Sequence, residues 1–122
     1  MEHENHQQTA RDFLTASDRE FLDGDKLQAS EKLWGAATHA VMAAAVQRNW
    51  PCRTHRALKL AVDQLADEFE DESLPGGFGL AEKFHKNFYH DEMEDYEIAT
   101  DRPRVHRFVH HLLALIDRNG DG

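Results

Sequence analysis

Arginine and histidine side chains cluster near the end of the sequence, at a spacing that could serve phosphate chemistry. Within eight residues the chain places Arg104, His106, Arg107, His110 and His111. A guanidinium binds phosphate oxygens through paired hydrogen bonds, and an imidazole gains or loses a proton near neutral pH. The cluster therefore predicts a site for a phosphate or an RNA backbone, where an arginine holds charge and a histidine moves protons.

An amphipathic helix is expected to position this cluster. At 100° per residue the apolar side chains fall in one stripe, opposite the basic ones. The stripe consists of Val105, Phe108, Val109, Leu112 and Ile116. The alternative interpretation is an ordinary solvated helix face, whose basic residues balance the acidic segments 63–72 and 91–101.

Two spacings could contribute metal ligands. Glu82 and His85 are three residues apart, as in di-iron helical bundles, but those sites need a second such pair. His106 and His110 are four residues apart, with Asp117 as a more distant third ligand. Because both ligand sets are incomplete, we expect no metal and no cofactor, and we assign His85 to a partly buried position beside phenylalanines.

The segment that contains His85 is rich in aromatic side chains. One interpretation places His85 or Tyr89 at a ligand or partner surface, to which Arg107 would also belong. The other assigns Phe84 and Phe88 to the core and leaves the Tyr89 hydroxyl at the surface.

Composition limits the class of protein. A chain of 122 residues with 40% hydrophobic and 30% charged residues suits one globular domain. The net charge of −9 argues against a freestanding nucleic-acid binder, which usually carries a basic excess. Cys52 is the only cysteine, so neither an intrachain disulfide nor a thiolate zinc cluster is possible.

The start of the sequence has no signal-peptide pattern. Residues 2–8 are wholly polar, and the longest apolar run, residues 40–46, is too short to span a bilayer. We therefore expect a cytoplasmic protein that does not enter a membrane.

Capping residues and prolines divide the chain into five expected helices. Asp25 and Thr54 can cap the second and third, and Pro51, Pro75 and Pro103 fall between or at the start of periodic segments. The expected helices are residues 8–22, 25–48, 54–70, 80–90 and 103–118. The acidic segments 71–79 and 91–101 are expected to be loops.

These elements predict an all-α, up-and-down bundle of about five helices, since no segment alternates like a strand. It would form one domain over residues 1–122, with short flexible ends near 1–7 and 118–122. Gly35 inside the long second helix costs about 1 kcal/mol relative to alanine. The alanines around it indicate that the third helix or a symmetry-related chain comes close there, with Glu31 and His39 at the flanks for buried polar contacts.

Two sequence blocks resemble those of a known group. Residues 29–37, with Glu31, Lys32, Trp34 and two alanines, resemble the Glu-Lys-x-aromatic-x-Ala-Ala block of small PaREP/HEPN-like proteins. Residues 84–89 look like a second block of an uncharacterised branch of that group. With the turn at 22–25, the likeness covers about half of the chain.

The resemblance implies an HEPN-like bundle of four or five helices that commonly forms a homodimer. Nucleases of the HEPN group carry Arg-x(4–6)-His, and this pattern is met by Arg104 with His110 or His111. In this chain Val105 follows the arginine, where the pattern usually has a polar residue. Other members are non-catalytic partners of nucleotidyltransferases or binding modules.

Three functions follow as hypotheses. The preferred one is a non-catalytic interaction or ligand-binding module that acts as a homodimer, with RNA or a nucleotidyltransferase-type protein as possible partners. The second is a metal-independent ribonuclease in which Arg104 stabilises charge and His110 or His111 transfers protons. The third is a metal-binding helical bundle that uses Glu82 and His85.

Overall fold

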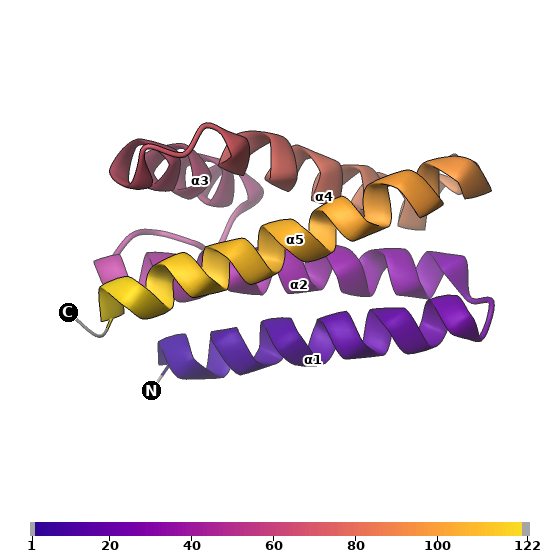
Figure 1. The fold of residues 1–122 in the computed structure, drawn as a ribbon, viewed down its shortest axis with the longest axis horizontal. Coiled ribbons are helices and arrows are strands. Elements are labelled where there is room, and N and C mark those ends of the chain that lie inside the picture. The colour runs from indigo at the N-terminus through magenta and orange to yellow at the C-terminus, as the bar shows by residue number, and fades with distance from the viewer. Residues whose placement is uncertain (1, 121–122) are drawn as a thin grey trace.

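The computed structural model describes the backbone of residues 2–120 and the side chains of residues 5–117. Five helices account for nearly all of this range (Figure 1). They are α1 (Glu2–Leu22), α2 (Lys26–Arg48), α3 (His55–Phe69), α4 (Ser73–His90) and α5 (Asp95–Gly120). No strand occurs within residues 2–120, so the predicted all-α bundle is confirmed.

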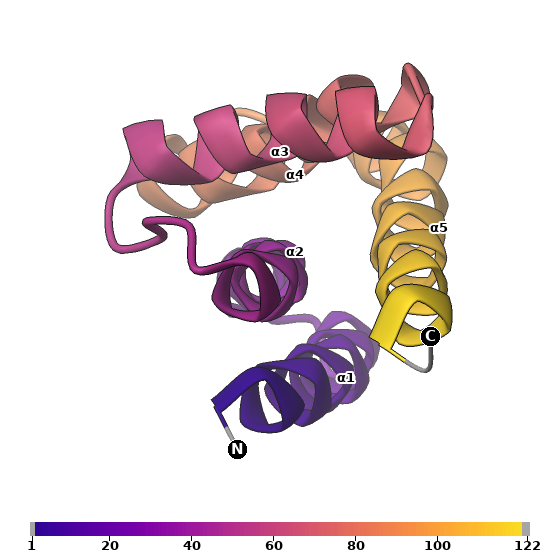
Figure 2. The same ribbon diagram turned by 90° about the vertical axis from the view of Figure 1, so that its left-hand side faces the viewer.

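Helix α2 lies at the centre of the bundle and contacts each of the other four helices. Helices α1 and α2 lie side by side and antiparallel, and together they form a helical hairpin (Figure 1). Viewed along α1, α2 and α5, helices α3 and α4 lie across the top of the molecule (Figure 2). The bundle therefore consists of two helical hairpins that cross each other, with α5 packed along one side.

The predicted starts of the second and third helices are confirmed. The side chain of Asp25 accepts a hydrogen bond from the Gln28 backbone N–H, and Thr54 does the same for Ala57. Each cap satisfies one of the N–H groups that a helix leaves unpaired in its first turn. Helix α1 begins at Glu2, earlier than the expected Gln8. Residues 1, 121 and 122, parts of the predicted flexible ends, lie outside the described residues.

Three helices end on a residue other than glycine in the left-handed conformation. These residues are Asn49, Glu70 and Asp91, with φ angles of 59°, 51° and 48°. The backbone N–H groups of Asn49 and Glu70 each donate to carbonyls of the preceding turn, which closes the ends of α2 and α3.

The prediction of a loop at 71–79 was wrong, because α4 already begins at Ser73. Pro75 is only the third helical residue, where no N–H is needed for an intrahelical bond. Leu74 and Phe78, one turn apart, are both buried in the core. Burial of these two side chains thus overrides the low helix propensity of the three glycines between residues 76 and 79.

The prediction of a loop at 91–101 was also wrong, because α5 begins at Asp95 and contains Pro103 in its interior. The Glu94 N–H donates to the Glu97 carboxylate, an arrangement like one half of a capping box. That hydrogen bond and the neighbouring Lys83 lower the pKa of Glu97. Ile98 and Asp101 are buried, so packing holds this acidic turn in a helix despite the proline that follows.

Gly35 and Gly77 mark two close approaches between helices. A Cβ at Gly35 would lie 3.3 Å from the Phe13 ring of α1. The close neighbour is therefore α1, whereas the sequence pattern predicted the third helix or a symmetry-related chain. A Cβ at Gly77 would lie 2.5 Å from Cδ1 of Phe108, which fixes the crossing of α4 and α5. In contrast, Gly79 has no other atom within 4 Å of its Cβ position.

Glu31 and His39 both make partly buried polar contacts, as expected. Glu31 contacts His85, and Nδ1 of His39 lies 2.9 Å from Nδ1 of His6. The second contact joins α1 to α2 and needs at least one neutral ring, because two imidazolium N–H groups would repel. Burial, together with the positive charge on His6, lowers the pKa of His39.

We expect Gly77→Ala to lower the free energy of unfolding by about 1–3 kcal/mol, because the added methyl group collides with Phe108. Gly79→Ala in the same helix is the matched control. It should raise the free energy of unfolding by about 0.5–1 kcal/mol, since alanine favours helix and meets open space. Urea unfolding followed by circular dichroism measures both, and equal effects of the two substitutions would contradict the close approach.

We expect acidification to weaken the contact between α1 and α2 at His39. Because the folded protein holds the pKa of His39 below its ordinary value of 6.5, the unfolded chain binds more protons at acidic pH. This contribution to stability is present above pH 6.5 and is lost as the pH falls. Thermal unfolding at pH 8 and pH 5.5 should show a smaller acid-induced loss for His39→Gln than for the unchanged protein. An equal loss in both would contradict this role of His39.

Candidate functional site

An open groove of about 620 Å³ lies between the first half of α4 and the middle of α5. Its lining includes all three residues that the sequence predicted as catalytic, Arg104, His110 and His111, together with Arg107. All four side chains are exposed. The volume falls in the range of small-molecule sites.

Helix α5 holds these side chains because its opposite face is fixed in the core. The predicted apolar stripe is confirmed, since Val105, Phe108, Val109, Leu112 and Ile116 are all buried. Phe108 also lines the groove, so one side chain both anchors the helix and forms an apolar part of the site. Val105 is fully buried, which explains why a polar residue does not follow Arg104 in this chain.

The wall opposite α5 consists of Ser73, Gly77 and Leu80 of α4. Ser73 and Gly77 were not among the predicted site residues, because the segment 71–79 was expected to be a loop. The helical spacing of 73, 77 and 80 was the signal that could have found them, since these three positions share one helix face.

Asp71 connects this wall to His111. Its carboxylate accepts hydrogen bonds from the Ser73 N–H (3.0 Å) and from the Ser73 hydroxyl, both on Oδ1. Its Oδ2 lies 2.5 Å from Nε2 of His111. The hydrogen bonds from Ser73, and then the one from His111, lower the pKa of Asp71. The carboxylate is therefore charged at neutral pH and already contacts one of the groove histidines.

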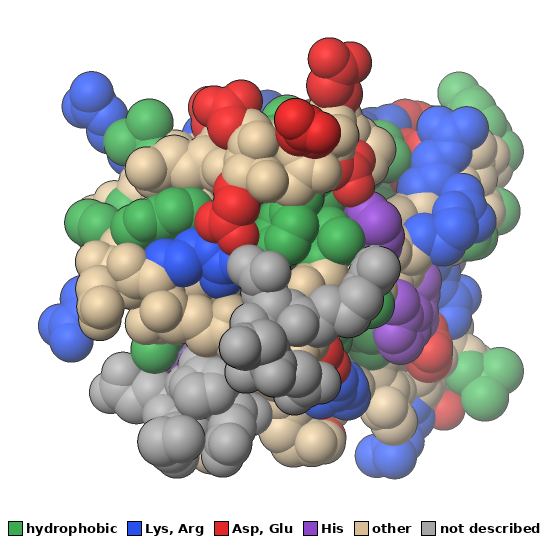
Figure 3. Space-filling view, turned by 60° about the vertical axis from the view of Figure 1, so that its left-hand side comes forward, with side chains coloured by type: hydrophobic (Ala, Val, Ile, Leu, Met, Phe, Trp, Pro, Cys, Tyr) green, Lys and Arg blue, Asp and Glu red, His purple; other side chains and the backbone are tan. Residues whose placement is uncertain are grey.

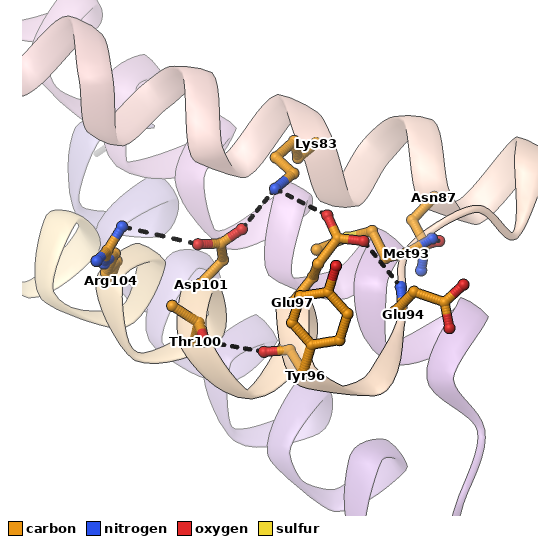
Figure 4. A network of polar contacts seen from close by, with 9 residues as sticks. All are labelled: Lys83, Asn87, Met93, Glu94, Tyr96, Glu97, Thr100, Asp101 and Arg104. Atoms are coloured by element: carbon orange, nitrogen blue, oxygen red, sulfur yellow. Dashed lines mark hydrogen bonds and ion pairs between the residues drawn. The ribbon is translucent and has the colours of Figure 1, made fainter.

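A second carboxylate lies next to Arg104. Asp101 is buried, with Oδ2 at 2.7 Å from Nζ of Lys83 and Oδ1 at 3.8 Å from the Arg104 guanidinium. Lys83 also contacts Glu97, so α4 and α5 are joined by one network (Figure 4). The hydrogen bond that Lys83 donates to Asp101 raises the pKa of Lys83. Arg104 thus has its charge partly balanced at one end of the groove.

Arg107 and His110 differ from their neighbours because neither makes an ion pair within the part of the chain that the structure describes. His106 lies outside the groove, where its Nε2 is 2.9 Å from Asp18 of α1. Although partial burial of Asp18 opposes it, contacts with Arg102 and His106 lower the pKa of this carboxyl. The predicted cluster therefore divides into four groove residues and one residue that joins α1 to α5.

His85 and Tyr89, predicted as a ligand or partner surface, do not line the groove. At 100° per residue His85 lies about 140° around α4 from Leu80. Its ring stacks on Trp34, with centroids 5.0 Å apart, and its Nδ1 is 2.8 Å from Glu31. Tyr89 packs edge-on against His85 and remains 66% exposed. The structure thus separates these two residues from Arg107.

The two spacings that suggested metal ligands are occupied by other contacts. Glu82 pairs with His55 at 3.0 Å, while His85 pairs with Glu31. Asp117 pairs with Arg11 of α1 rather than with His110. Among the side chains of residues 5–117, no group of three or more His, Cys, Asp or Glu residues could hold a metal ion.

The surface charges are unevenly distributed. Figure 3 shows histidine side chains next to several lysine and arginine side chains along one side of the face it draws, with other basic side chains at the opposite side and acidic side chains at its top. On a protein with a net charge of −9, the grouping beside the histidines creates a local positive surface. None of the helices, over the described residues, is long and apolar enough to cross a membrane.

The fold and the groove define a small all-α protein with basic side chains along a groove between two helices. Residues 5–109 match the model of the archaeal PaREP1/PaREP8 family, and the chain therefore belongs to this family. This confirms the PaREP part of the resemblance, whereas the likeness to HEPN domains stays a prediction. No curated protein matches the sequence.

A solved structure supports the fold. The chain is similar to a protein from Sulfolobus solfataricus whose crystal structure is known, with 18% sequence identity and a TM-score of 0.77. The match covers 87% of this chain and 94% of that protein. At this identity the likeness concerns the arrangement of the helices.

Proposed function

We propose that the protein is a non-catalytic binding module whose groove between α4 and α5 takes a phosphate-bearing ligand, with single-stranded RNA as the candidate. The observation that carries the proposal is the convergence of Arg104, Arg107, His110 and His111 on one groove of an acidic protein. Arg107 is exposed and has no acidic partner among the described residues, so its charge is available to an anion.

The apolar lining extends the ligand class beyond a bare anion. The partly exposed Leu80 and a small exposed part of the buried Phe108 line the groove, and they offer apolar contact beside the basic side chains. A nucleotide of RNA matches this combination, because it joins an apolar base face to a phosphate.

Two observations favour binding over catalysis. The Arg104 guanidinium lies 3.8 Å from the buried Asp101 carboxylate, so part of its charge is already balanced where an oxyanion would need it. The buried Val105 replaces the polar residue that the nuclease pattern usually has.

The assembly and partner in this proposal come from the family resemblance. The module would act as an HEPN-like homodimer in the cytoplasm, and a nucleotidyltransferase-type protein is a possible partner. Light scattering of the purified protein, alone and with a candidate partner, would test both.

We expect Arg107→Ala to weaken binding of a fluorescein-labelled single-stranded RNA by about threefold to fivefold, the scale of one partly exposed charge contact. The slope of the logarithm of affinity against the logarithm of salt concentration should fall by about one. Fluorescence anisotropy at several salt concentrations measures both quantities.

The matched control is Arg56→Ala, which removes another exposed arginine, from α3 and away from the groove. It should leave the affinity within about twofold. If both substitutions weaken binding equally, the RNA follows net charge and the groove is not its site. If the unchanged protein does not bind RNA, and removal of the Asp71 charge beside His111 does not restore binding, the proposed ligand is wrong.

A ribonuclease is the second candidate, favoured because Arg104 and His110 line the same groove at the spacing of the nuclease pattern. In such a reaction the RNA 2′-oxygen gives its proton to a base and attacks the adjacent phosphorus. The 5′-oxygen leaves with a proton from an acid, and a 2′,3′-cyclic phosphate remains. His110 or His111 would transfer the protons, and Arg104 would stabilise the charge on phosphorus.

Incubation of the protein with RNA in EDTA separates the two candidates. For a binding module we expect no cleavage above that of a mock purification. Cleavage that both Arg104→Ala and His110→Ala reduce by about 100-fold or more would instead establish the nuclease. Cleavage that neither variant changes would identify a contaminant and leave the binding module in place.

A further inference from the structure

We propose that Asp71 competes with the ligand of the groove. Its carboxylate contacts His111 at the position that the phosphate of a ligand would take. The proposal rests on the proposed function, because it assigns a means of regulation to the same groove. A ligand that binds Nε2 of His111 must then displace the Asp71 carboxylate, and binding is coupled to the start of α4.

The contacts of Asp71 show how it can act in this way. One carboxylate oxygen holds Ser73, the first residue of α4, and the other holds His111 of α5. The Asp71 side chain is 20% exposed and that of His111 is 44% exposed, so a dissolved anion can reach the contact. A carboxylate and a phosphate both present negatively charged oxygens to an imidazole N–H, and one N–H serves only one of them well.

The segment that Asp71 holds is the part of α4 with the lowest intrinsic preference for helix. Ser73–Gly79 contains Pro75 and three glycines, and each glycine disfavours helix by about 1 kcal/mol relative to alanine. The residue before the helix, Glu72, makes no side-chain cap, so the Ser73 N–H depends on Asp71. Ser73 and Gly77 also line the groove, which places the weakly held turn in the path of a ligand.

Competition differs from simple repulsion in one measurable respect. A carboxylate that only repels a phosphate does so whether or not residue 111 is a histidine. A carboxylate that competes for the His111 N–H loses most of its effect when that imidazole is removed. The coupling between substitutions at 71 and 111 therefore distinguishes the two mechanisms.

The experiment measures the affinity of the same labelled single-stranded RNA for the unchanged protein, Asp71→Asn, His111→Ala and the double variant. Asparagine keeps an oxygen for the Ser73 N–H and removes the charge. We expect Asp71→Asn to tighten binding by about threefold to fivefold, and by less than about 1.5-fold when residue 111 is alanine. Asp63→Asn, which removes an exposed charge from α3, is the control for net charge and should change affinity by less than about 1.5-fold.

Each outcome decides the proposal. If the unchanged protein binds RNA and Asp71→Asn does not bind more tightly, competition by Asp71 is wrong while the groove remains the binding site. If Asp71→Asn tightens binding equally with either residue at 111, the carboxylate acts by repulsion and the proposal is wrong. If none of the variants binds, the proposed function fails and the competition fails with it. Binding by Asp71→Asn alone would support strong competition.

Thermal unfolding of each variant keeps the comparison valid. Asp71→Asn should remain folded with an unchanged helical circular dichroism spectrum. If it does not, Ser73→Ala provides the second test, since it removes the hydroxyl contact to Asp71 and leaves Asp71 and His111 in place. A freer Asp71 carboxylate competes for His111 at least as well, so Ser73→Ala should bind RNA no more tightly than the unchanged protein, and tighter binding would contradict the proposal.

Discussion

The arrangement of the whole molecule depends on how closely other helices can approach α2. Its buried surface consists largely of alanine, with Ala36, Ala40 and Ala44 fully buried along its length. Small side chains bring neighbouring helix axes together, and at Gly35 the ring of Phe13 lies almost against the backbone. One helix can therefore contact four others in a chain of this size. Because α4 and α5 both pack on α2, their own crossing at Gly77 and Phe108 is fixed, and the groove lies beside that crossing.

The parts of the fold that were predictable from sequence are those determined by local chemistry. Asp25 and Thr54 cap their helices through their own side chains, so the starts of α2 and α3 followed from residue types alone. The first turns of α4 and α5 could not be predicted in this way. Their proline and glycines disfavour helix locally, and burial of Phe78 and Ile98 against distant residues decides the conformation.

The residues of the candidate site also divide into those that local sequence predicts and those that it does not. Arg104, Arg107, His110 and His111 lie on one helix, so helical spacing alone brought them together. The other wall belonged to a segment that was expected to be a loop, and the contact of Asp71 with His111 joins residues that are 40 positions apart. No local pattern encodes such a contact. The separation of His85 from Arg107 could not be predicted either, because it depends on which face of α4 meets α2.

The left-handed residues at three helix ends have a consequence for how the chain folds. Glu70 and Asp91 stand where glycine is usually preferred, and the left-handed conformation costs other residues about 1–2 kcal/mol. Their local sequence therefore carries no strong stop signal, and the ends of α3 and α4 depend on the packing of the segments that follow them. We expect each of these helix boundaries to be defined only in the folded bundle.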